Sequence, residues 1–149
     1  MKKECKFYNI LFPIWMLILF PIAWVIIVPA NFIIDSIVLF ISMSLLKLSN
    51  KKELYKKHIF KIFLFGMISD IIGSLLILLL FYIFENVAVG DELYLTCPGI
   101  LLSMLMIFIF NYFITFKKLD KKERFRLSLI YAIITAPYTY LIPTSWIYY

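Results

Sequence analysis

Residues 62–84 read IFLFGMISDIIGSLLILLLFYIF, a run of apolar residues in which Asp70 is the one charged side chain. A transmembrane helix needs about 20 consecutive, mostly apolar residues. This stretch therefore predicts a helix that crosses a membrane. The whole chain agrees, because 64% of its 149 residues are hydrophobic, 16% are charged and its mean hydropathy is +0.96. Soluble domains are about 45–50% apolar and about 25% charged.

Other apolar blocks predict further spans in the same chain. The block that starts at residue 10 is too long for one span, and Pro29, Ala30 and Asn31 offer a break within it. The last block is short and contains Pro137, so four spans with a short or re-entrant fifth segment are the alternative. We predict an all-α integral membrane protein with one domain, residues 1–149, built as a five-helix bundle. The expected spans are residues 10–28, 31–47, 62–84, 98–116 and 127–142.

The basic residues indicate how these spans are oriented. All 15 Lys and Arg residues fall in three clusters, within residues 2–6, 47–61 and 117–126, and each cluster borders an apolar block. The segment 85–92 instead carries acids and no base. The positive-inside rule then predicts an amino terminus inside and a carboxyl terminus outside. It also makes the bilayer and anionic lipid headgroups the expected partners of the basic loops, and it argues against nucleic acid.

Cysteine and histidine give no indication of a cofactor or a metal. Cys5 and Cys97 are predicted on opposite sides of the membrane, so no disulfide is expected within one chain. His58 is the single histidine, and no metal ligand lies near it at a usable spacing. The richness in Ile, Lys, Phe and Tyr suggests a bacterial inner membrane as the location.

Asp70 is the most informative polar residue within the predicted spans. A charged side chain at the bilayer centre costs about 2.5–3.5 kcal/mol on insertion scales, so it is a functional candidate by default. Gly66, Gly73 and Ser74 lie on the same face of the predicted helix, which favours close helix packing. Asn111 in the next span lies at a similar depth. We therefore predict a hydrogen bond between Asp70 and Asn111.

Asp35 and Asn31 allow two interpretations. In the structural one, Asn31 caps a helix and Asp35 lies in its first turns, where the helix dipole favours negative charge. In the functional one, Asp35, Asp70 and Asn111 step through the bundle from its outer side to its inner side. No Lys, Arg or His lies in the core of a predicted span. A buried aspartate then has three alternatives. It can take up a proton and hydrogen-bond to a neighbouring helix, bind a cation, or pair with a basic residue of another protein.

A second group of polar residues surrounds Pro137 in the last span. Thr135, Tyr138, Thr139 and Thr144 carry hydroxyls that can satisfy the carbonyls freed by the proline, and a ligand site is the alternative.

Three classes of function follow from these residues. An enzyme is disfavoured, because the predicted depths of Asp35 and Asp70 differ by about 7–8 Å and no catalytic motif is present. A non-enzymatic accessory or assembly subunit of a membrane complex is the leading interpretation, since it requires only packed helices. The alternative is a small transporter or channel component that handles protons or cations. It would use Asp70 with Asn111, and Asp35 is an optional third residue. Either class allows a homo-oligomer or a larger membrane-protein partner.

Overall fold

The computed structural model describes residues 21–84 and 93–142, and this part of the chain consists of helices and turns with no strand. Long apolar runs without paired strand patterns explain this, because a helix satisfies all its backbone hydrogen bonds within itself. The elements are η1 (Pro21–Ala23), α2 (Trp24–Leu45), α3 (Lys51–Ile83), α4 (Leu93–Phe110), the π-helical η2 (Asn111–Thr115), α5 (Lys121–Ile134) and η3 (Tyr138–Leu141).

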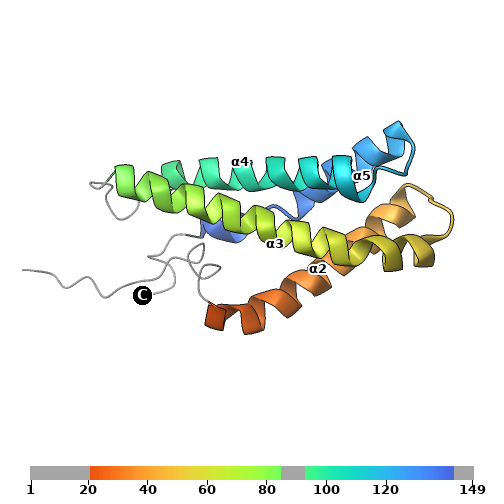
Figure 1. The fold of residues 1–149 in the computed structure, drawn as a ribbon, viewed down its shortest axis with the longest axis horizontal. Helices are drawn as coiled ribbons and strands as arrows, with labels where there is room; N and C mark the ends of the chain where they lie inside the picture. Colours follow the sequence, from red (N-terminus) through yellow and green to blue (C-terminus); the bar gives the residue numbers. More distant parts are fainter. Residues whose placement is uncertain (1–20, 85–92, 143–149) are drawn as a thin grey trace, which may run out of the picture.

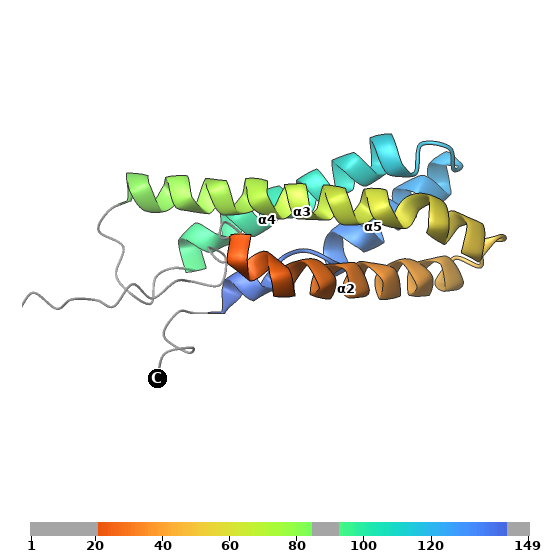
Figure 2. The same ribbon diagram turned by 60° about the horizontal axis from the view of Figure 1, so that its bottom comes forward.

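The helices form a bundle in which each packs against the next along the chain, and α5 returns to contact α2 (Figures 1 and 2). Helix α3 is the centre of this arrangement, with α2 on one side and α4 on another. The turns α2–α3 and α4–α5 lie together at one end of the bundle (Figure 1). Two of the three basic clusters therefore lie at the same end, as the charge pattern predicts; the cluster at residues 2–6 is outside the described residues.

Three of these helices are long and apolar enough to cross a membrane: Pro21–Leu45, Lys51–Ile83 and Leu93–Thr115. The prediction of an all-helical chain with membrane-length helices is thus confirmed for the described residues. Residues 21–84 and 93–142 contain four α-helices and not the five predicted for the whole chain. The fourth, α5, has 14 residues and begins with the polar sequence KKERFR, so it is too short to span a bilayer alone.

The predicted break at Pro29 is also wrong. Helix α2 runs without interruption from Trp24 to Leu45 and contains Pro29 in its interior. Proline removes one backbone hydrogen bond, and a membrane helix tolerates this when neighbouring groups compensate. The end of the predicted first span, residues 10–28, therefore belongs to the same helix as the predicted second span. Residues 10–20 lie outside the described part of the chain.

The third span begins earlier than the hydropathy pattern indicates. Helix α3 starts at Lys51 and includes most of the second basic cluster, which we expected in a loop. A tight turn makes this possible, since Lys47 and Asn50 both adopt positive φ values, 51° and 58°. Polar residues at a membrane helix end can continue the helix into the headgroup region, where hydropathy no longer reports it.

Two apolar clusters fill the bundle at different heights along α3. One contains Ile62 together with Leu39 of α2 and Leu127 of α5, and lies toward the basic end. The other contains Ile77 with Ile100 of α4 and Tyr140 of η3. Residues 66–70 of α3 lie between these clusters along the helix, and this is the level at which the polar residues gather.

Candidate functional site

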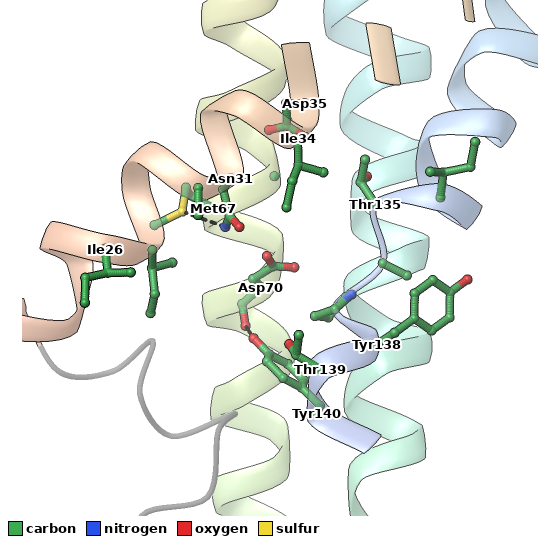
Figure 3. Close-up of a pocket in the computed structure, with 16 residues that line it drawn as sticks. Ile26, Asn31, Ile34, Asp35, Met67, Asp70, Thr135, Tyr138, Thr139 and Tyr140 are labelled. Atoms are coloured by element: carbon green, nitrogen blue, oxygen red, sulfur yellow. Dashed lines mark hydrogen bonds between the residues drawn. The ribbon is translucent and has the colours of Figure 1, made fainter. Parts of the chain in front are cut away.

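A pocket of about 440 Å³ opens between α2, α3 and the segment 134–140 (Figure 3). Its volume is in the range of small-molecule sites, about 300–1,000 Å³. Most of its lining is apolar. The polar or titratable side chains that line it are Asn31, Asp35, Asp70, Thr135, Tyr138, Thr139 and Tyr140.

Asp70 enters the pocket from α3 in the middle of the bundle. Its side chain points from α3 into the pocket in Figure 3, and the residue is 8% exposed. The carboxylate oxygen Oδ1 is buried and has no hydrogen-bond partner. The backbone carbonyl of Asp70, in contrast, accepts a hydrogen bond from the Tyr140 hydroxyl at 3.2 Å. The backbone at this position is therefore fixed, while the carboxyl group stays available.

Asp35 reaches the same pocket from α2 and faces Gly66 of α3. A β-carbon on Gly66 would lie 3.6 Å from Asp35 Oδ2, so the carboxylate lies beside α3 at this level. Asp35 is 7% exposed. Its backbone carbonyl accepts a hydrogen bond from the Tyr131 hydroxyl of α5, which ties α5 to α2 at this level.

The capping role predicted for Asn31, with Asp35 in a first helical turn, is wrong. Because α2 begins at Trp24, both residues lie in the middle of the helix. Asn31 instead contacts α3, where its Nδ2 donates a weak hydrogen bond of 3.4 Å to Met67 Sδ. The helix dipole acts only in the first and last turns, so it offers Asp35 no compensation here.

The two carboxylates share the pocket without a basic partner. Among the described residues that line it there is no Lys, Arg or His. Within residues 21–84 and 93–142, no hydrogen bond or ion pair reaches either carboxylate. An isolated carboxylate is unfavourable in a medium of low dielectric constant. The arrangement can therefore hold a proton or attract a cation.

Asn111 lies outside this pocket, and the predicted hydrogen bond between Asp70 and Asn111 is wrong. Asn111 opens the π-helical segment η2 and is 1% exposed. Both of its side-chain amide atoms are buried without a hydrogen-bond partner. Similar depth in neighbouring helices does not ensure contact, because the two side chains must also face each other around the helix axes.

The segment after α5 borders the pocket with backbone that is not α-helical. The Tyr138 amide donates to the Ala136 carbonyl at 2.7 Å across Pro137, whose φ of −75° and ψ of 66° define an inverse γ-turn. Thr135 Oγ1 donates to the Tyr131 carbonyl at 2.7 Å, and the Tyr138 hydroxyl donates to the Ile133 carbonyl. Hydroxyls do satisfy carbonyls beside the proline, and the same residues also line the pocket. Thr144 lies outside the described residues.

Tyr140 is the residue of the pocket that sequence reasoning missed. It is 5% exposed and accepts a hydrogen bond of 2.9 Å from Ser74 Oγ while its own hydroxyl donates to the Asp70 carbonyl. Its place beneath Asp70 is visible in Figure 3. The available signal was the polar and aromatic sequence around Pro137, which is unusual inside an apolar span.

The predicted small-residue face of α3 serves several neighbours rather than one. Gly66 faces Asp35 of α2, and Ser74 contacts Tyr140 of η3. Gly73 lies against α4, where an added β-carbon would be 2.0 Å from Ser103 Oγ. Residues seven positions apart differ in height by about 10 Å along a helix, so one face can meet different partners.

The described residues contain no group of three His, Cys, Asp or Glu side chains that could hold a metal ion. No protein-family model matches the chain, no curated protein matches it significantly, and no solved structure does. The function must therefore be inferred from the pocket itself.

Proposed function

We propose that this protein handles cations within a membrane, as a small transporter or a component of one, with Asp70 and Asp35 as its binding groups. One observation carries the proposal. A carboxylate at mid-helix, nine-tenths buried and without a partner on Oδ1, lines a pocket of about 440 Å³. Such residues in membrane helices mark ion, proton or substrate pathways because nothing else offsets their desolvation.

The accessory-subunit interpretation receives less support from the same geometry. It predicts a closed interior in which Asp70 and Asn111 hydrogen-bond to each other and hold two helices together. The described residues lack that bond, and Asp70 borders open space instead. Asn111 consequently drops out of the proposed binding set, and Asp35 joins it, since both aspartates line one pocket.

The surroundings of the pocket fit a polytopic protein of a cell membrane, and we propose the bacterial inner membrane. The turns 46–50 and 116–120 would lie on the cytoplasmic side, where their basic residues meet anionic headgroups. The described end formed by Phe84 and Leu93 would face outward. An amino terminus inside and a carboxyl terminus outside stay a prediction, as does assembly into an oligomer.

Water access to the pocket tests the proposal. In a chain with Cys5→Ser and Cys97→Ser, single cysteines would be placed at three positions: Thr139→Cys in the pocket, Ser103→Cys in the α3–α4 contact and Leu75→Cys on the exposed apolar surface. Ser103 is fully buried and Leu75 is 50% exposed. Thr139→Cys keeps both carboxylates, so it does not disturb the proposed binding groups.

A charged, membrane-impermeant methanethiosulfonate reagent would then be applied to each side of sealed vesicles. We expect Thr139→Cys to react at least tenfold faster than both controls, because a charged reagent needs a hydrated path. Asp70→Cys would test the same path at the carboxylate itself. Equal, slow reaction at all positions in folded protein would contradict a hydrated cation site and return the accessory-subunit interpretation to first place.

A further inference from the structure

We propose that the ligand of this pocket is an amphipathic organic ammonium ion, held by its charged group between Asp35 and Asp70 with its apolar body along Ile26 and Ile27. This inference rests on the proposed function and narrows it from cations in general to one chemical class. It depends on how charge and apolar surface are distributed along the pocket.

Both carboxylates line the same pocket, one from α2 and one from α3. Asp35 Oδ2 faces Gly66, and Asp70 follows Gly66 by four residues on the same face of α3. This offset corresponds to a rise of about 6 Å. An ammonium group has three donors in a compact volume, so it can hydrogen-bond to carboxylates from both helices.

Along α2, the pocket continues from Asp35 with mostly apolar side chains. Going back along α2 from Asp35, its lining residues are Ile34, Asn31, Ala30, Ile27 and Ile26. The nine positions between Asp35 and Ile26 correspond to about 13 Å of helix. The pocket is therefore longer than a single ion requires, and its walls away from the acids favour a hydrocarbon or aromatic group.

The aromatic ring of Tyr140, which lines the pocket, also favours an organic cation as the ligand. Tyr140 lies directly below Asp70 in Figure 3, and its hydroxyl is already engaged with Ser74 and with the Asp70 carbonyl. What it still offers a ligand is its ring. Aromatic rings attract organic cations as well as apolar groups.

An inorganic ion fits these walls less well. Calcium takes six to eight oxygen ligands, and the described residues provide no cluster of three metal-ligating side chains. The amide of Asn31 is turned to Met67 as a donor. A neutral ligand fits no better, because it would leave both carboxylates buried and unpaired.

Calorimetric titration of the purified full chain in lipid nanodiscs tests the inference. The probes are butylamine, 2-phenylethylamine and 1-adamantanamine, with 2-phenylethanol as the neutral counterpart of the second. We expect at least one amine to bind, and 2-phenylethylamine to bind at least tenfold more tightly than 2-phenylethanol. Asp70→Asn and Asp35→Asn should each weaken amine binding at least tenfold, since each removes one charged acceptor.

Glu53→Gln is the matched control, because Glu53 is an exposed acid at the basic end of α3 and lies outside the pocket. It should leave amine binding unchanged. Equal amine binding by the wild-type chain and the Asp35→Asn/Asp70→Asn double variant would overturn the inference, since it would indicate partition into lipid.

The same titrations with Na⁺, K⁺ and Ca²⁺ separate this inference from the proposed function. If an inorganic cation binds in a manner that requires Asp70 and none of the three amines binds, the organic-ammonium inference is overturned while the cation-handling function stands. If no cation binds and Thr139→Cys stays unreactive, both are overturned.

Discussion

Helix α3 has two contrasting surroundings at neighbouring heights. Against α4 it is in tight contact: an added β-carbon on Gly73 would lie 2.6 Å from the Gly99 carbonyl oxygen, and Ser103 Oγ donates to the Ser69 carbonyl at 3.0 Å. Against α2 it borders the pocket, where Asp70 keeps an unpartnered oxygen. The contrast shows that the chain can pack small residues closely, so the space at Asp70 is not explained by a general inability to pack.

The largest effect is expected from Gly73→Ala. Its methyl group would overlap Ser103 Oγ, which could turn away only by losing its hydrogen bond to the Ser69 carbonyl, and the Gly99 backbone, which cannot move cheaply. We expect a loss of about 1–3 kcal/mol in the free energy of unfolding, the usual cost of overpacking. Denaturation in mixed micelles with increasing SDS would measure it.

Gly66→Ala is the control for Gly73→Ala, since its β-carbon would meet Asp35 Oδ2 at an ordinary contact distance of 3.6 Å. We expect a change within about 0.5 kcal/mol. If both substitutions destabilise the protein equally, the two sides of α3 are equally packed and the contrast is lost.

Tyr140→Phe should have an intermediate effect. It removes two buried hydrogen bonds, with Ser74 Oγ at 2.9 Å and with the Asp70 carbonyl at 3.2 Å, each worth about 1 kcal/mol. We expect a loss of about 1–2 kcal/mol in the same unfolding assay. Tyr138→Phe, whose residue is 46% exposed, should cost less. The reverse order would show that η3 does not anchor the pocket to α3.

A smaller effect than that of Gly73→Ala, and one of opposite sign, is expected from Asp70→Leu without ligand. Replacing a buried carboxyl group that has no side-chain partner should raise the free energy of unfolding by about 1 kcal/mol, as unpaired buried polar groups are costly. The same variant should lose amine binding. A loss of more than 1 kcal/mol in unfolding free energy would instead identify Asp70 as a structural hydrogen-bonding residue.

The sequence was sufficient to predict the helical, membrane-length character of α3, because hydropathy over about 20 residues has one structural solution in lipid. It failed at Pro29, since a proline signals a break in water more strongly than in a membrane helix. The last helix was predicted to begin at residue 127, because the residues before it are rich in charge. Helix α5 instead begins at Lys121 and includes these charged residues. Local composition does not reveal whether a polar segment continues a helix above the headgroups.

The acids of the site were predictable, whereas their partners were not. Asp35 and Asp70 stand out because a charge in an apolar run needs a reason. That they meet in one pocket depends on the crossing of α2 over Gly66, and that Tyr140 lines it depends on contacts across 66 and 70 residues of sequence. Pairing by equal depth selected Asn111, because depth fixes one coordinate and leaves the rotation of each helix undetermined.

The interrupted backbone at residues 135–140 has a consequence for the wall of the pocket. Its inverse γ-turn at Pro137 and the short η3 leave it less self-sufficient in lipid than a continuous helix. Several of its hydrogen bonds and contacts come from α3, through Ser74 and the Asp70 carbonyl. The position of this segment therefore depends on α3, so a substitution at Ser74 of α3 also alters the wall of the pocket.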